Sequence, residues 1–267
     1  LNVTQNSLIS INLSADTNNT PIKIVSGAWD TTIIATTSLI GNINYPSNDT
    51  IITIYGDVRE FHCNNNNTKI TGIDVSKNVA LCSLSCYTNQ LTSLDISKNT
   101  ALTYLNCCQN NLTTLDVSSC PALNKLLCYI NEISSLNVSN CKALKKLDCG
   151  FNNLTTLDVS GCDSLNELMC DSNKFTTAGF DFLMCSLPDR NGDTAGYFRP
   201  LRDANDGTYS AFMVSNSQNA QAKNWQVRYG NSGPTIPATS GNYDCIKGYP
   251  QANMNRYITL NVKQGEQ

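Results

Sequence analysis

The sequence predicts a solenoid that is α/β by convention but mostly β in content, with one parallel sheet and a cap at each end. A 21-residue unit repeats in phase through the middle of the chain, and both flanks read as short strands separated by turn-forming residues. Units of this length bury an apolar face only by stacking on their neighbours. We therefore divide the chain into a β-rich N-terminal cap at 1–57, six repeat units at 58–175, and a mixed C-terminal cap at 176–267 that holds one short helix and then strands.

The repeat is clearest in four consecutive units that start at residues 80, 101, 122 and 143. A fifth unit starts at residue 164 and diverges, and the first unit, from residue 58, carries a two-residue insertion. All share the pattern L-x-x-L-x-C-x-x-N-x-L. Because side chains alternate along a strand, Leu105 and Cys107 are predicted to point into the core, and Asn106 and Cys108 to point outward.

A column of asparagines follows the strand in every unit, where a side-chain amide can satisfy backbone groups of the turn. The column is Asn66, Asn89, Asn110, Asn131, Asn152 and Asn173, and we assign it a structural role. A second turn reads Asp95-Ile96-Ser97 and its counterparts, whose polar side chains cap backbone groups on the convex side. A 21-residue unit has little room for a helix, so we expect extended or single-turn segments there.

Thirteen cysteines occur in the chain, and most recur at the repeat period. One inward column is Cys63, Cys86, Cys107, Cys128, Cys149 and Cys170, and a second, at the turn, is Cys120, Cys141 and Cys162. Neighbours on parallel strands lie roughly 4.8 Å apart, further than the roughly 3.5–4.5 Å between the Cβ atoms of a disulfide. Both columns are therefore interpreted as buried thiols. For the remaining Cys82, Cys108, Cys185 and Cys245 the redox state stays open, and a Cys185–Cys245 disulfide is one alternative.

The N-terminal cap is predicted to cover the apolar end of the solenoid with strands. The segments that read as strands are 7–15, 21–27, 31–40 and 51–56, and turn-forming residues separate them.

The C-terminal cap is predicted to begin with a short amphipathic helix. Phe180, Leu183, Met184 and Leu187 share one helix face, and Pro188 ends the pattern. The segments 197–202, 209–214, 224–230 and 256–262 then read as strands that continue or close the sheet. Residues 260–264 echo residues 1–5, so we expect either that the natural chain continues past Gln267 or that an edge-strand segment is reused.

The repeat pattern, the LTTLDVS-type second half, the β-rich leader and the segment LPDRNGDTAG at 187–196 together resemble bacterial surface leucine-rich-repeat proteins, of which internalins are the best-known type. The unit has 21 rather than 22 residues, and the leader reads as β rather than helical. The resemblance implies a right-handed solenoid with its parallel sheet on the concave face, and secretion or anchoring at the cell surface. It also implies non-enzymatic binding of a protein from a host or neighbouring cell, in adhesion or host interaction.

The outward positions of the strands form the expected binding face. Aromatic and apolar side chains occur there where the fold requires none, with charged side chains beside them, as in binding hot spots. The candidate ligand-binding residues are Tyr87, Tyr104, Lys125, Leu127, Tyr129, Lys146, Asp148, Phe151 and Met169, with Ile130 next to them. Three alternatives stay open: the tyrosines could stabilise the sheet by cross-strand stacking, the C-terminal segment could cover them, or the rings could bind carbohydrate instead of protein.

Composition argues against other function classes. A net charge of −3 with 15% charged residues lacks the basic footprint of a nucleic-acid binder. No apolar run reaches the length of a membrane span, and no leader precedes Leu1, so we expect a removed targeting segment or an excised fragment. The one histidine, His62, has no apparent nucleophile, acid or metal-ligand partner in the sequence. We therefore expect no enzyme activity, no metal and no cofactor.

Overall fold

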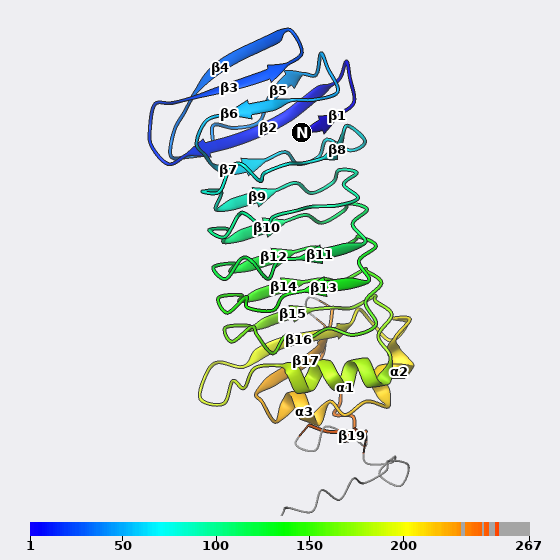
Figure 1. Ribbon diagram of the computed structural model, residues 1–267. Coiled ribbons are helices and arrows are strands. Elements are labelled where there is room, and N and C mark those ends of the chain that lie inside the picture. The colour runs from blue at the N-terminus through cyan, green and yellow to red at the C-terminus, as the bar shows by residue number, and fades with distance from the viewer. Residues whose placement is uncertain (231–232, 242, 246–248, 251–267) are drawn as a thin grey trace, which may run out of the picture.

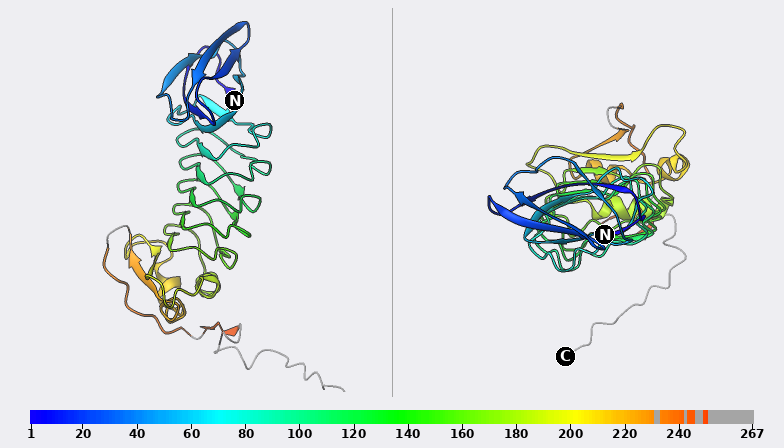
Figure 2. Two further views of the ribbon diagram at one scale, coloured as in Figure 1. Left: turned by 90° about the vertical axis from the view of Figure 1, so that its left-hand side faces the viewer. Right: turned by 90° about the horizontal axis from the view of Figure 1, so that it is seen from above.

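The structure is a computed structural model that describes residues 1–230, 233–241, 243–245 and 249–250. It is an elongated solenoid with a β cap at its N-terminal end and helices at its C-terminal end (Figure 1). Within the described residues a ten-stranded sheet runs in the order β17-β16-β15-β14-β12-β10-β9-β7-β2-β5. The two caps lie at opposite ends of the stacked turns in a second view (Figure 2). The predicted solenoid with a parallel sheet and two caps is confirmed.

Each repeat contributes one short strand to this sheet. The strands are β7 (Val58–His62), β9 (Ser83–Ser85), β10 (Tyr104–Asn106), β12 (Lys125–Leu127), β14 (Lys146–Asp148) and β15 (Glu167–Met169). They pair in parallel and in register, so that Leu105 aligns with Leu84 and Leu126, all fully buried. The far side of the turns consists of loops and two paired strands, β11 (Thr114–Asp116) and β13 (Ser135–Asn137). Residues 58–175 contain no helix, as expected.

The asparagine column bonds neighbouring turns to each other. Asn110 is buried, and its amide donates to the carbonyls of Cys86 and Cys107, both at 3.0 Å. Its side-chain oxygen accepts from the Leu91 N–H at 3.0 Å. Asn131, Asn152 and Asn173 repeat this arrangement. The structural role assigned to the column is confirmed.

The second turn also forms as predicted. The side-chain oxygen of Asp95 accepts from the Ser97 N–H at 2.9 Å, and Asp116 does the same for Ser118. These bonds lower the pKa values of Asp95 and Asp116, because they stabilise the charged carboxylate.

The cysteines of both columns are buried free thiols, as interpreted from their spacing. Burial raises the pKa of Cys63 to about 12, so this thiol stays protonated and unreactive. The remaining four cysteines divide. Cys185 and Cys245 form a disulfide with a Cα–Cα distance of 5.3 Å, which settles the alternative left open by the sequence, whereas Cys82 and Cys108 are free.

The N-terminal cap joins the repeats through the main sheet. Strand β2 (Leu8–Ala15) pairs antiparallel with β7 on one side and with β5 (Ile43–Pro46) on the other. Strands β3 (Thr20–Ser26), β4 (Trp29–Ala35) and β6 (Thr53–Tyr55) form a smaller sheet, and β1 (Asn2–Val3) pairs with β8 (Ile70–Gly72). The cap is β-rich as predicted, and β2 extends the repeat sheet directly.

The C-terminal cap confirms the short helix, α1 (Thr177–Ser186), which buries Phe180, Leu183 and Met184. Strands β16 (Gly196–Leu201) and β17 (Trp225–Tyr229) extend the sheet in parallel, as expected for 197–202 and 224–230. The remaining short elements are α3 (Gln218–Gln221) and the antiparallel pair β18 (Tyr243–Asp244) and β19 (Tyr249–Pro250). The segment 256–262 and the echo at 260–264 lie outside the described residues.

The prediction of a strand at 209–214 is wrong, because Tyr209–Met213 forms helix α2. The carbonyl of Asp206 accepts from the Tyr209 N–H at 2.9 Å and so starts the helical turn. Helix α2 buries Phe212 against Phe180 with ring centroids 5.2 Å apart, edge to face. The conformation of this segment is therefore determined by the burial of one aromatic residue, Phe212, rather than by an alternating apolar face.

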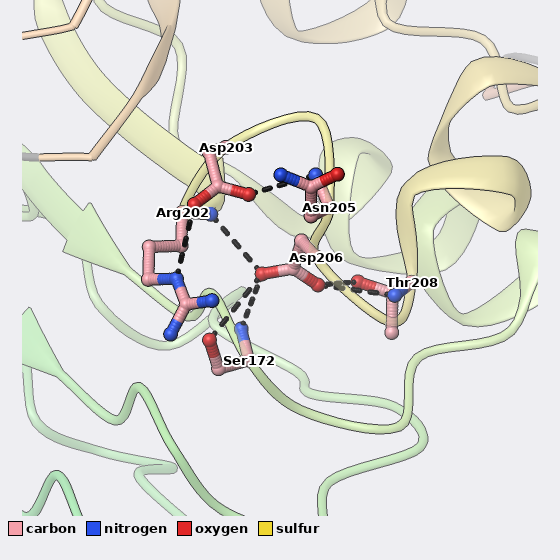
Figure 3. Close-up of polar contacts among 6 residues, drawn as sticks. All are labelled: Ser172, Arg202, Asp203, Asn205, Asp206 and Thr208. Carbon is pink, nitrogen blue, oxygen red and sulfur yellow. Dashed lines mark hydrogen bonds and ion pairs between the residues drawn. The ribbon is translucent and has the colours of Figure 1, made fainter.

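Asp206 caps the backbone hydrogen bonds that join each turn of the solenoid to the next. In the preceding unit the Phe151 N–H donates to the carbonyl of Asp171 in the next turn, at 2.9 Å. Ser172 has no further turn to bond, and its N–H donates instead to the buried carboxylate of Asp206 at 2.8 Å (Figure 3). The same carboxylate accepts from the backbone of Arg202 and Thr208. Burial raises the pKa of Asp206, but these bonds outweigh it and the net shift is downward.

Candidate binding face

The outward side of β7, β9, β10, β12, β14, β15 and β16, with the residues that follow each strand, is here called the sheet face. At one end it meets the cap loop whose Gly41 N–H donates to the Asn12 side chain on β2. At the other end it continues onto β16, where Tyr197 aligns with Glu167 and Arg199 aligns with Met169. All the candidate ligand-binding residues lie on this face, so the structure brings them onto one surface.

Tyr87, Tyr104 and Tyr129 on the sheet face are half-buried, and their hydroxyls have partners. The Asn65 amide donates to the Tyr87 hydroxyl at 3.1 Å. A hydrogen bond with the Cys108 thiol, together with burial, raises the pKa of Tyr129 to about 12. Within the described residues these rings make no ring–ring contact with one another, which weighs against cross-strand stacking as their role. The hydrogen bonds therefore hold the Tyr87 and Tyr129 rings in place on the sheet face.

Three residues predicted to point outward are buried: Asn106, Cys108 and Met169. Met169 is only 4% exposed, because the guanidinium of Arg199 lies 2.7 Å from its sulfur. Cys108 points outward as predicted but is 1% exposed beside Tyr129. The alternative that the C-terminal segment covers the face is therefore correct at Met169, and Met169 is not open to a ligand. Arg199 was missed because the sequence predicted a strand at 197–202 but not its register, which places Arg199 beside Met169.

Ile130 and Phe151 combine two unfavourable features. Their side chains are 43% and 41% exposed, and their backbone φ angles are +54° and +53°. The same position in other units is also left-handed and holds Asn65, Thr88, Gln109 and Ser172. The left-handed conformation costs most residues about 1–2 kcal/mol, and β-branched or bulky residues adopt it least readily. Folding alone does not explain an isoleucine and a phenylalanine here, so we treat both as candidate contact residues.

Replacing Ile130 by asparagine should stabilise the protein by about 1 kcal/mol, because asparagine tolerates the left-handed region and occupies it already at Asn65. The midpoint of urea unfolding should rise without a change in its slope. Phe182→Asn, also on an exposed apolar residue but inside helix α1, is the control and should not stabilise. A lower midpoint for Ile130→Asn would show that the isoleucine side chain packs usefully in the folded protein.

The charged residues of the face divide into paired and unpaired groups. Glu167 receives Lys146 at 3.0 Å and Arg199 at 2.9 Å. Asp148 accepts a bond of 3.3 Å from the Gly150 N–H, and within the described residues no ion pair reaches either Asp148 or Asp171. Burial, with a smaller contribution from the neighbouring Asp171, raises the pKa of Asp148 to about 6. Burial likewise raises the pKa of Asp171.

His62 has one neighbour that the sequence did not predict. Its Nε2 lies 3.3 Å from the hydroxyl of Ser83 on the next strand, the residue that is aligned with Glu60. In the described part of the chain no carboxylate is hydrogen-bonded to the ring, and burial lowers its pKa. The described residues contain no group of three or more His, Cys, Asp or Glu side chains placed to hold a metal ion.

A hollow of about 750 Å³ lies away from the sheet face, where the N-terminal cap meets the first units. Core residues such as Phe61 and Val75 line it, together with the turn residues Asp74 and Asp95. Those two carboxylates are already bonded to Ser76 and Ser97. The hollow is a packing gap at the junction of cap and solenoid.

The stacked parallel strands, the in-register leucines and the asparagine and cysteine columns define the class: the chain is a leucine-rich-repeat solenoid protein. No protein-family model matches it, and no curated protein is similar to it. Among solved structures it is similar to the functional domain of InlJ from Listeria monocytogenes, which includes a cysteine ladder. The two are 42% identical over 47% of this chain and 28% of that chain, with a TM-score of 0.42.

A second similar structure is an internalin, InlF, from Listeria monocytogenes, with 14% identity and a TM-score of 0.32. The match covers 62% of this chain and 59% of that one. This chain therefore spans less than two thirds of the length of either structure. The assignment to the class rests on the repeat and the fold.

Proposed function

We propose that this chain is the non-enzymatic binding module of a bacterial cell-surface or secreted protein, and that it recognises a protein ligand through the sheet face, in adhesion or host interaction. The observation that carries the proposal is the placement of Ile130 and Phe151, exposed and in the left-handed region, beside tyrosines with fixed hydroxyls. Exposed apolar and aromatic groups of this kind are typical of binding hot spots.

A protein ligand suits the mixed chemistry of the face better than a carbohydrate. Lys125 lies over the Tyr104 ring, 5.6 Å from its centroid, and Arg202 lies equally far from that of Phe151. These cations occupy ring faces on which a sugar would stack. Carbohydrate binding remains the second candidate, because the rings of Tyr87 and Tyr129 carry no such cation among the described residues.

The proposed location outside the cytoplasm is supported by the Cys185–Cys245 disulfide, because disulfides persist in oxidising compartments. Within the described residues no helix has the length and apolar character needed to cross a membrane.

The test is a pull-down that compares the intact protein with a Tyr87→Ser, Tyr129→Ser, Phe151→Ser variant, using extracellular proteins and glycans as separate prey sets. We expect protein prey to be captured by the intact protein and lost with the triple variant, since hot-spot side chains carry most of the affinity. The matched control replaces Tyr55, Phe182 and Val214 by serine, three exposed residues outside the sheet face. It should capture prey normally.

Circular dichroism and the urea midpoint establish that both variants fold. Equal capture by the intact protein and the triple variant would remove the sheet face from the proposal. Capture of glycans but no protein would favour the carbohydrate alternative, and an unfolded triple variant would favour a structural role for the rings.

A further inference from the structure

The carboxylates of Asp148 and Asp171 on the sheet face both lie close to Gly150. Gly150 occupies the column that holds Tyr87, Cys108 and Tyr129 on the preceding strands. Its backbone is not in the left-handed region, so conformation does not require glycine. A Cβ at this position would lie 3.3 Å from Oδ1 of Asp171 and 3.5 Å from Oδ1 of Asp148. Both carboxylates, here called the carboxylate pair, therefore border the same point on the face.

The cations around the carboxylate pair are bonded elsewhere. Lys146 and Arg199 both form ion pairs with Glu167. Arg202 is bonded to Asp203 at 3.3 Å and lies over the Phe151 ring. Lys146 and Arg199 lie near enough to lower the pKa of Asp148, and Arg202 that of Asp171, but among the described residues none of these cations forms an ion pair with either acid. Burial outweighs these cations, so the charged form of both carboxylates is disfavoured in the folded state. A cation supplied from outside would favour that charged form.

The residues around the pair suit a cation with an aliphatic stem. Tyr129 precedes Gly150 in its column, and the exposed Ile130 and Phe151 lie in the turns that follow the strands. The stems of lysine and arginine pack on apolar and aromatic surfaces while their charged heads bind carboxylates. A bare metal ion requires further ligands, and the described residues provide no group of three acidic, His or Cys side chains.

We propose that the carboxylate pair, Asp148 and Asp171, receives a lysine or arginine side chain of the protein ligand, flanked by apolar contacts to Ile130 and Phe151. This inference rests on the proposed function and specifies the chemistry of the ligand at one place on the sheet face. A single basic side chain of the ligand is the anchor. The tyrosines on the preceding strands, Tyr87, Tyr104 and Tyr129, contact the ligand residues on either side of that anchor.

The test uses small probes, so that it does not depend on knowing the ligand. Capped arginine and capped lysine, each with an acetylated N-terminus and an amidated C-terminus, are titrated into the full chain while backbone amide resonances are recorded. Capped glutamine is the neutral control probe, and calcium chloride tests a metal ion. The variant is Asp148→Asn with Asp171→Asn. Its matched control is Asp163→Asn, an exposed acid in the turn between the same two strands.

We expect the basic probes to shift the amides of Gly150 and Phe151 in a saturable way, and the neutral probe to have no effect. The double variant should bind the basic probes at least about tenfold more weakly, the factor that corresponds to losing about 1.4 kcal/mol, whereas Asp163→Asn should leave them unchanged. Asparagine matches aspartate in shape and removes an unfavourable charge, so the double variant should fold.

Shifts that are absent, or that persist in the double variant, would overturn the inference. A response to calcium without a response to the basic probes would assign the pair to a metal ion instead. Prey captured in the pull-down together with a negative probe titration would leave the proposed function in place and remove only the basic anchor. If the pull-down captures no prey, the proposed function is contradicted. The carboxylate pair is then no longer assigned to a basic side chain of a protein ligand.

Discussion

Replacing Asn110 by leucine should destabilise the solenoid by about 3–5 kcal/mol. The substitution leaves the N–H of Leu91 without its partner, which costs about 1–3 kcal/mol. It also removes one bond each from the carbonyls of Cys86 and Cys107, at about 0.5–1.5 kcal/mol apiece, although these carbonyls still accept from Asn89 and Asn131. Leucine has as many side-chain heavy atoms as asparagine, so the substitution leaves no cavity. Urea unfolding followed by circular dichroism measures the change in midpoint and slope.

The neighbouring Asn111 provides the control for this substitution. Asn111 is exposed, and Asn111→Leu should change stability by no more than about 0.5 kcal/mol. Because each turn contacts only its neighbours, a reduced slope for Asn110→Leu would mean that the solenoid unfolds in two parts on either side of the substituted turn. A loss below about 1 kcal/mol would mean that water replaces the amide, and the asparagine column would then not be what bonds the turns together.

The repeat region could be predicted in detail because its period constrains every column at once. Leu105, Cys107 and Asn110 recur with the same spacing in each unit, and the alternation of a strand then dictates which side chains face the core. The cysteine column followed from the same geometry, since parallel neighbours are too far apart to form a disulfide. The position of each candidate residue on one face was therefore implied by the sequence.

The C-terminal cap could not be predicted in the same way, because it has no internal period to fix its register. Residues 209–214 form a helix around the single anchor Phe212, and Arg199 covers Met169 only because β16 adds a strand beside β15. The Cys185–Cys245 disulfide likewise depends on how the chain returns after β17. These contacts join segments far apart in sequence, and local composition carries no signal for them.

The left-handed turn after each strand was also missed, although the proposed function depends on it. The sequence places Asn65, Thr88 and Gln109 at this position in the first three units, and only the backbone angles show that all of them are left-handed. Once that is known, Ile130 and Phe151 become residues that the turn disfavours. The signal for these two residues was their difference from the residues at the same position in the other units, and a consensus pattern does not show such differences.

Asp148→Asn should make the protein more stable at neutral pH, by up to about 3 kcal/mol, the free energy that corresponds to a pKa shift of about two units. The folded pKa of Asp148 is raised by burial to about 6 from an ordinary 3.8, so the folded state holds a proton between those values that the unfolded state has lost. The contribution of Asp148 to stability is therefore most favourable below the window and decreases as the pH rises through it. Above about pH 6 the folded protein carries the full cost of the charge.

The measurement is the urea midpoint of both proteins from pH 4 to pH 8. The stability advantage of the variant should grow as the pH rises from about 4 to about 6 and stay constant above that. It should be small near pH 4, where Asp148 is neutral in the folded protein. Asp95 and Asp116, whose pKa values are lowered, change stability in the opposite direction but equally in both proteins. The difference therefore reports on Asp148 together with its effect on the neighbouring Asp171. A difference that does not depend on pH would mean that Asp148 titrates as an ordinary surface acid.

A stabilised Asp148→Asn variant would also bear on function. If the carboxylate destabilises the folded chain, folding does not account for its presence, and contact with a ligand becomes the explanation that remains for a charge held half-buried beside Asp171. The same reasoning applies to Ile130, where the expected gain comes from backbone conformation rather than charge. If both Asp148→Asn and Ile130→Asn raise the stability of the protein, for these two different reasons, the neighbouring residues they replace are not selected for folding. This part of the sheet face is then the expected binding surface. If both substitutions lower the stability instead, both residues have a structural role.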